Sequence, residues 1–159
     1  ILENMSMAEH KGKIFGLQRG TNRKKIPEYR EQLAQLGLGL EDKMQVKVGA
    51  LSGGQRQALS LLMSVMTPVE FLILDEHTAA LDPKTADIIM QLTDRIVKEK
   101  KLTAIMVTHN LRYAAEYGDR LVMMHQGKAV MDMKGEKKQK VQIDDILGKF
   151  NEISIECGN

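Results

Sequence analysis

A five-residue stretch, Leu51-Ser52-Gly53-Gly54-Gln55, constrains this 159-residue chain more than any other feature of its sequence. It directly precedes an apolar run with helical spacing, so both glycines fall at the start of a predicted helix. Each glycine weakens a helix by roughly 1 kcal/mol relative to alanine, so a pair is expected where the backbone must approach another group closely. A helix N-terminus offers unpaired N–H donors and partial positive charge, and a phosphate can rest there.

The same residues also permit a purely structural interpretation. Ser52 and Gln55 have the spacing of a capping box, in which the serine accepts from the amide of residue 55 and the glutamine reaches back. A capping box does not require two adjacent glycines. The sequence therefore favours a phosphate-binding turn, with the helix cap as the alternative.

The chain after Leu51 alternates predicted strands and helices, which indicates a parallel sheet flanked by helices and places the protein in the α/β class. Both strands read as continuous apolar runs, so we expect them to be covered on both faces. The expected elements are a helix over Ser52–Thr67, a strand over Phe71–Leu74, a helix over Pro83–Lys100 with Ile88, Ile89, Leu92, Ile96 and Val97 inward, a strand over Leu102–Val107, a short helix from Asn110 to Tyr117, a hairpin of Arg120–His125 and Lys128–Met133, a charged connector over Gly135–Lys140, and a helix over Val141–Phe150.

The first 49 residues show helical periodicity and no convincing strand. We expect helices over Ile1–Arg19 and from Ile26 to Gly37, joined by a basic connector.

Composition excludes several kinds of protein. A net charge of +2, three Phe, three Tyr and no Trp give little support to a nucleic-acid partner. The single cysteine, Cys157, excludes an intrachain disulfide and is interpreted as an incidental thiol. No apolar run is long enough for a membrane span and no secretory leader is visible, so we expect a cytoplasmic location.

Polar residues follow the predicted strands. Asp75 and Glu76 end the first, where a carboxylate can hold Mg²⁺ and another can polarise a water molecule. His109 ends the second and could contact a phosphoryl group or the attacking water. Each has a simpler alternative: a solvated acidic turn for the carboxylates, a polar loop residue for His109, and a helix cap for the nearby Asp82.

Taken together, these motifs resemble those of the ABC (ATP-binding cassette) ATPases. Leu51–Gln55 matches the family's signature motif, Leu72–Glu76 its Walker B motif with the catalytic glutamate, Ala80–Asp82 its D-loop, and His109 its switch histidine. His77 departs from the pattern, because many members have proline there.

The resemblance implies a role for each matching residue. Asp75 would bind in the Mg²⁺ shell, Glu76 would act as the general base, and His109 would sense the γ-phosphate. Asp82 would link the two sites of a dimer.

The signature residues would act on nucleotide held elsewhere. Ser52, Gly53 and Gly54 would contact the γ-phosphate of an ATP bound to a second subunit, whose close approach would explain the glycines. Leu51 and Gln55 would shape the turn.

The resemblance also implies domains and missing parts. Residues 1–67 would form the helical subdomain, 68–133 the second half of a RecA-like, P-loop NTPase core, and 134–159 a C-terminal extension. The phosphate-cradling Walker A pattern, Gly-x-x-x-x-Gly-Lys-[Ser/Thr], is absent from the sequence, as is the Q-loop. ATP and Mg²⁺ would therefore need a Walker A from a missing N-terminal part and from a partner subunit, and this chain alone is expected to be inactive.

The partners that the resemblance implies are a second ATPase subunit in a head-to-tail dimer, a membrane permease that would hold the protein at the inner face of the membrane, and a substrate-binding protein. The tail is similar to ATPases of amino-acid-type importers. The alternatives are a non-transport ABC ATPase of translation or DNA metabolism, and a non-catalytic chain that only donates a signature face.

Overall fold

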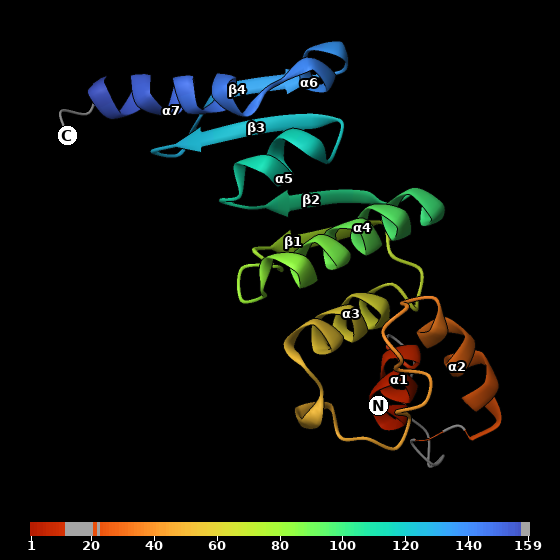
Figure 1. Cartoon of the computed structure of the whole chain (residues 1–159). Helices are drawn as coiled ribbons and strands as arrows, with labels where there is room; N and C mark the ends of the chain where they lie inside the picture. The colour runs from red at the N-terminus through yellow and green to blue at the C-terminus, as the bar shows by residue number, and fades with distance from the viewer. Residues whose placement is uncertain (12–20, 22, 157–159) are drawn as a thin grey trace. The chain divides into compact units, whose positions relative to one another are not determined.

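The computed structural model describes the backbone of residues 1–11, 21 and 23–156 (Figure 1). These residues belong to two compact units, Ile1–Met106 and Val107–Asn159. Cys157 and most of the second half of the helix expected over Ile1–Arg19 lie outside the described residues. Among the described helices, none is long and apolar enough to cross a membrane.

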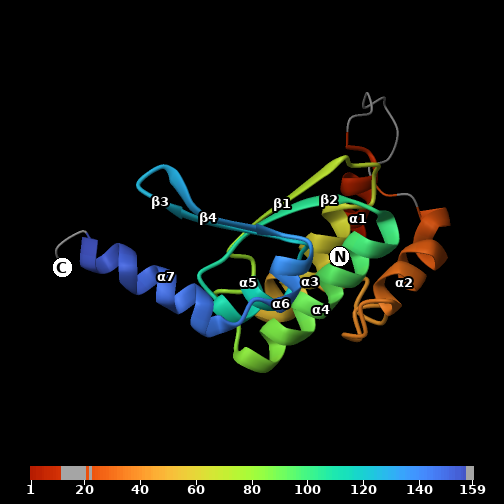
Figure 2. The same cartoon turned by 90° about the horizontal axis from the view of Figure 1, so that it is seen from above.

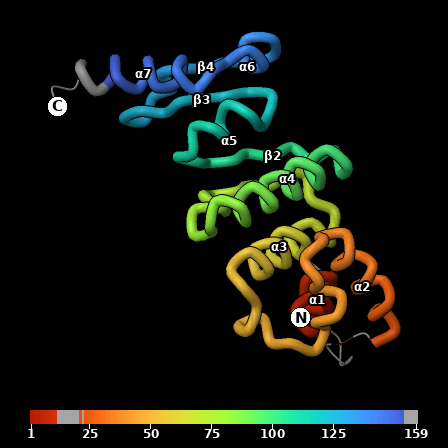
Figure 3. The backbone as a smooth tube through the Cα atoms, in the orientation of Figure 1, coloured from red at the N-terminus to blue at the C-terminus, as the bar shows by residue number. Residues whose placement is uncertain are grey.

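The described residues of the first unit form four α-helices and a strand pair, whose second strand ends one residue beyond the unit. Its elements are α1 (Leu2–Glu9), the 3₁₀ turn η1 (Arg23–Lys25), α2 (Ile26–Ala34), the 3₁₀ turn η2 (Val48–Ala50), α3 (Gly53–Ser64), β1 (Phe71–Asp75), α4 (Pro83–Lys100) and β2 (Thr103–Val107). Strands β1 and β2 pair in a two-stranded parallel sheet, which confirms the predicted α/β class. Figure 3 shows the chain passing from β1 along α4 and back to β2.

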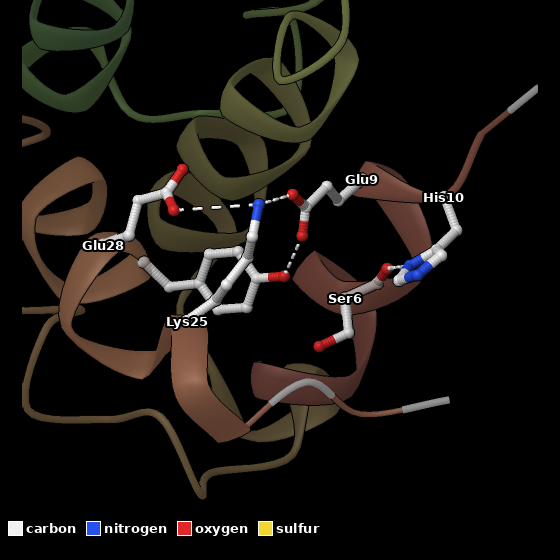
Figure 4. Close-up of polar contacts among 6 residues, drawn as sticks. Ser6, Glu9, His10, Lys25 and Glu28 are labelled. Atoms are coloured by element: carbon white, nitrogen blue, oxygen red, sulfur yellow. Dashed lines mark hydrogen bonds and ion pairs between the residues drawn. The ribbon is translucent and has the colours of Figure 1, made fainter. Parts of the chain in front are cut away.

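Helices α1 and α2 are joined by a partly buried polar contact (Figure 4). The fully buried Tyr29 donates its hydroxyl to Glu9 Oε2 at 2.6 Å, and Lys25 forms an ion pair with the same carboxylate. Burial, followed by the hydrogen bond to Glu9, raises the pKa of the Tyr29 phenol. The tyrosine therefore stays neutral and fixes the start of α2 against the end of α1.

The strand pair is covered on one face only, so the expectation of coverage on both faces was wrong. Leu72 and Leu74 are buried, whereas Phe71 and Ile73 are 61% and 70% exposed. The cluster that holds both leucines includes Ile89, Leu92 and Ile96 of α4, and Figure 2 shows α4 along one side of the pair. Because successive side chains of a strand alternate, Phe71 and Ile73 point away from α4.

Helix α4 follows its prediction closely. The Asp82 carboxylate accepts from the Thr85 amide at 3.0 Å, and Pro83 occupies the first turn. Of the residues expected inward, Ile89, Leu92 and Ile96 are buried and Val97 is half-buried. Ile88 is 38% exposed, because its position in the helix turns it off the buried stripe.

The second unit begins with the predicted short helix and hairpin. It contains α5 (Leu111–Glu116), β3 (Arg120–His125), β4 (Lys128–Lys134), α6 (Glu136–Lys140) and α7 (Ile143–Glu156). The Asn110 side chain caps α5 by accepting from the amides of residues 112 and 113. Strands β3 and β4 pair antiparallel around Gln126 and Gly127, which both have positive φ, as a tight hairpin turn requires.

One prediction in the second unit was wrong. The connector expected over Gly135–Lys140 contains the helix α6, and its Lys138 is only 2% exposed. Lys138 Nζ donates to the carbonyl oxygen of Ala115 at 2.5 Å, and burial lowers the pKa of this lysine. The prediction failed because a lysine in a charged segment is expected to be solvated, whereas the aliphatic stem of Lys138 is packed inside the unit.

The division proposed at residues 67 and 133 stays a prediction. The apolar cluster of the first unit crosses residue 67 without a break, since Leu62 and Val65 share it with Leu72 and Leu74. The helical part and the β1–β2 part therefore have one common core.

Candidate functional site

The signature turn, Leu51–Gln55, forms the capping box that its spacing permits. Ser52 Oγ accepts from the Gln55 amide at 3.2 Å, and Gln55 Oε1 accepts from the Ser52 amide at 3.3 Å. The first turn of α3 is thus stabilised by its own side chains. Helix capping and phosphate binding are compatible here, because several N–H groups at a helix start lack an intrahelical partner.

Groups outside the motif hold the same turn. Gln55 Nε2 donates to the Leu38 carbonyl oxygen at 3.0 Å, and Lys43 Nζ donates to Gln55 Oε1 at 3.4 Å. Arg56 Nη1 donates to the Leu51 carbonyl oxygen at 2.5 Å. Sequence analysis missed Lys43 and Arg56, and no local spacing signal identifies their contacts.

The glycines of the turn are explained by contacts within this chain. A Cβ on Gly54 would lie 2.2 Å from Thr85 Cγ2 at the start of α4, and a Cβ on Gly53 would lie 3.2 Å from Leu81 Cδ2. Close approach from a second subunit is therefore not needed to account for Gly54. The start of α3 packs so tightly on the start of α4 that a Cβ at position 54 would overlap the Thr85 methyl group, and the predicted approach of a second subunit stays a prediction.

The carboxylate turn, Asp75–Asp82, connects β1 to α4. Asp75 ends β1 and Glu76 follows it, and both side chains are exposed. Glu76 has φ of 44°, a left-handed conformation that is uncommon outside glycine and costs on the order of 1–3 kcal/mol. The amide of Ala79 donates to the Glu76 carbonyl oxygen at 2.9 Å and closes the turn.

His77 directly follows the exposed Glu76, and its side chain points toward α4. Its Nε2 lies 3.2 Å from Oγ1 of Thr93, a residue of α4 that is 4% exposed. Burial lowers the pKa of the His77 imidazole, which favours the neutral ring. Sequence analysis treated this histidine only as a departure from the family pattern, because its contact lies 16 residues away in sequence.

A hollow of about 560 Å³ lies beside both turns within the first unit. One wall is the start and outer face of α3, including Gly53 and Arg56, and the other is formed by Asp75, Glu76 and His77. The structure therefore brings part of the signature turn and the predicted catalytic carboxylates to one cavity.

The remaining predicted residues lie outside this lining. Asp82 caps α4, and the hydrogen bonds from the Thr85 side chain and amide lower its pKa. His109 belongs to the second unit, between β2 and the Asn110 cap of α5. The structure thus shows Asp82 as a helix cap, and the link between two sites predicted for Asp82 and the role predicted for His109 both stay predictions.

The donor set at the end of β1 fits a magnesium ion. Mg²⁺ is commonly held by one or two carboxylates together with phosphate oxygens and water, so it does not need a cage of protein ligands. Asp75 and Glu76 are adjacent and exposed, and the described residues contain no group of three or more His, Cys, Asp or Glu arranged around a metal position. Such a site fits an ion that arrives with a nucleotide.

Comparison with known proteins agrees with these motifs. The family model described as "ABC transporter" matches residues 1–79. A tyrosine transport ATP-binding protein of Clostridioides difficile (strain R20291) is 47% identical over 150 residues, which cover 94% of this chain and 59% of that protein. The chain belongs to the ATP-binding subunits of the ABC transporter family.

Other members of the ABC family extend this result. A phosphonates import ATP-binding protein of Ruegeria sp. (strain TM1040) is 36% identical over 69% of this chain and 42% of its own length. Among solved structures, an ATP-binding cassette of an ABC transporter in its ADP conformation has a TM-score of 0.74 at 24% identity and covers 99% of this chain and 62% of its own. That likeness shows the fold. The chain spans about three fifths of the tyrosine transport relative and less of the phosphonate one.

Proposed function

We propose that this chain supplies the signature turn and the catalytic carboxylates of an ATPase that drives an ABC transporter. The observation that carries the proposal is the placement of Asp75 and Glu76, exposed and adjacent at the carboxyl end of β1, beside the hollow that Gly53 also lines. Ligands of α/β proteins bind at the carboxyl ends of parallel strands. The family membership supports the same reaction.

Each carboxylate has a distinct part in this proposal. Asp75 would hold Mg²⁺, which when bound supplies charge stabilisation to the phosphates of ATP. Glu76 would orient and deprotonate the attacking water, because its side chain is exposed and directly follows the metal-binding position. His109 would contact the γ-phosphate from the loop after β2.

The signature turn would complete a site on another subunit. Ser52, Gly53 and Gly54 carry amides at the start of α3, where the helix dipole favours a phosphate. Leu51 and Gln55 set the shape of the turn, since Leu51 is 4% exposed and Gln55 has both of its polar atoms bonded within the chain. In keeping with the head-to-tail dimer that the family resemblance implies, we infer that ATP reaches these residues on a partner subunit. Because these 159 residues contain no Walker A pattern, we also infer that this polypeptide alone hydrolyses no ATP.

The transport role rests on the relatives. Their names describe tyrosine transport and phosphonate import, which supports an importer and favours an amino-acid-type substrate. We propose a membrane permease as the second partner, a substrate-binding protein as the third, and a cytoplasmic position against the membrane.

The direct test measures ATP binding and hydrolysis in the complete protein that carries this sequence. Glu76→Gln should reduce hydrolysis by on the order of 10²–10⁴-fold, the usual contribution of a general base, while ATP binding stays within twofold. Equal loss of binding and hydrolysis would make Glu76 a binding or folding residue. Co-purification with a permease would separate transport from roles on ribosomes or DNA.

A further inference from the structure

We propose that His77 is a positioning residue for ATP hydrolysis, which anchors the carboxylate turn to α4 through Thr93 and so holds Glu76 in place. The inference rests on the proposed function, because it assigns the reaction to Glu76. It gives a structural role to His77, which stands where many family members have proline.

The direction of the hydrogen bond follows from its second partner. Thr93 Oγ1 also lies 2.7 Å from the Ile89 carbonyl oxygen, which can only accept. The single hydroxyl hydrogen of Thr93 is therefore donated to Ile89, and Oγ1 accepts from His77. His77 thus carries a proton on Nε2, and its ring orientation is fixed by a buried group of α4.

The anchor acts next to a strained residue. Glu76 has φ of 44°, and such a conformation persists only where the surrounding structure determines it. The amide of Ala79 holds the carbonyl group of Glu76, and the His77–Thr93 bond holds the following side chain. The peptide that joins Glu76 to His77 is therefore restrained from both sides.

His77 stiffens the turn by a different means from the proline that many family members have at this position. A proline stiffens a turn by fixing its own φ, and it biases the preceding residue away from helical conformations. His77 leaves the backbone of Glu76 free to adopt positive φ and supplies stiffness through its side chain.

A competing role is available, because His77 also lines the hollow and could handle a proton of the reaction itself. The two roles differ in what Thr93 should do. If His77 positions Glu76, removing the Thr93 hydroxyl has nearly the same effect as removing the imidazole. If His77 acts on the reacting atoms, removing the imidazole lowers the rate far more than removing the Thr93 hydroxyl.

The test compares His77→Leu, Thr93→Val and their combination in the complete protein, with ATP turnover as the readout. We expect each single change to lower kcat about fivefold, the size of one lost hydrogen bond, with KM for ATP within about twofold. The kcat of the double variant should be about equal to that of the less active single variant, because both changes remove the same hydrogen bond. His77→Gln and Thr93→Ser, which keep a donor and a hydroxyl, should recover most of the loss. Thr103→Val, at an exposed threonine of β2, is the matched control and should have no effect.

Several results would overturn the inference. Unchanged kcat in Thr93→Val would mean that the bond positions nothing, and a hundredfold loss confined to His77→Leu would make His77 a catalytic residue. A lowered Tm with unchanged kcat would show that the contact stabilises the fold and does not position Glu76 for the reaction. Failure of the unsubstituted protein to hydrolyse ATP would contradict the proposed function instead. In that case the amide NMR resonances of residues 76 and 77 still test whether His77 anchors the turn. Thr93→Val should shift both resonances, and unchanged resonances would exclude the anchor.

Discussion

The signature turn and the carboxylate turn lie beside one hollow, yet the chain stabilises them differently. In the signature turn, the side chains of Ser52 and Gln55 each accept from the backbone amide of the other residue, and Gly54 packs against Thr85. In the carboxylate turn, Asp75 and Glu76 are exposed and Glu76 has an unfavourable backbone conformation. The first turn is held by bonds of its own side chains, with further bonds to Lys43 and Arg56, whereas the second is held by the side chain of His77 and the amide of Ala79, which follow the two carboxylates in the same turn.

This difference indicates how binding and reactivity are divided. A turn that presents backbone amides to a phosphate can use its side chains for its own structure. A turn that presents carboxylates must leave those side chains unburied, so its stability has to come from adjacent residues. Substitutions in the first turn should therefore change folding first, and substitutions in the second should change the reaction first.

The largest effect should come from the metal position. Asp75→Asn keeps the size of the side chain but removes its charge, and it should lower kcat/KM for ATP by on the order of 10²-fold or more, since a metal supplies several kcal/mol of charge stabilisation. The Mg²⁺ concentration needed for half-maximal rate should rise. Tm should stay nearly constant, because Asp75 is exposed. Loss of folding instead of activity would abolish the contrast between the turns.

The tight packing of Gly54 gives the next effect. Gly54→Ala should destabilise the protein by about 1–3 kcal/mol, because the new Cβ would overlap Thr85 Cγ2. Thr85→Ser removes that methyl group while keeping the hydroxyl, so the double variant should recover most of the loss. Urea unfolding measures both, and Gly49→Ala, where a Cβ would meet nothing within 4 Å, is the matched control. If the double variant is as unstable as Gly54→Ala alone, overlap with Thr85 is not the reason that position 54 requires glycine.

The helix cap gives a smaller effect. Ser52→Ala removes the acceptor for the Gln55 amide and should cost about 1 kcal/mol of unfolding free energy. Ser60→Ala, at an exposed interior position of α3, should be neutral or slightly stabilising because alanine favours helix. Equal stability of the two variants would mean that the capping box does not contribute.

The smallest effect concerns pH. Hydrogen bonds from Thr85 lower the pKa of Asp82 below its usual value of 3.8, so the folded state favours the ionised carboxylate. The resulting stabilisation is present above the unfolded pKa and is lost as pH falls through the lower folded pKa. Urea midpoints between neutral pH and pH 3 should show wild type losing its advantage over Asp82→Asn at the acidic end. A constant difference would contradict the assignment.

Periodicity predicted most of the fold, because α2, α3 and α4 have clear apolar spacing. Helices α3 and α4 also have capping residues, and α2 has a proline in its first turn. It could not show which face of β1 is covered, since an apolar strand reads alike with one helix layer or two. It also missed α6, because the buried Lys138 gives the same sequence signal as a solvated lysine.

The sequence indicates the groups that we propose to react, but it does not indicate the residues that hold them in place. Asp75 and Glu76 follow a strand in a recognisable pattern, whereas the contacts of Lys43, Arg56 and Thr93 depend on tertiary packing. The contact of Gly54 with Thr85 of the same chain also depends on tertiary packing, and it gives this glycine a structural reason in addition to the predicted approach of a second subunit.

The central claim is that the signature turn serves nucleotide held by another subunit, and mixing two inactive variants of the complete protein tests it. Glu76→Gln removes the general base and Ser52→Arg blocks the signature turn, so each variant alone should be inactive. In a mixed dimer, one site combines an intact Glu76 with an intact signature turn from the partner, and random pairing should restore about a quarter of the wild-type sites. Recovered ATP hydrolysis on mixing is the predicted result. No recovery, with mixed dimers shown to form, would contradict the account, because it would mean that both turns act within one chain.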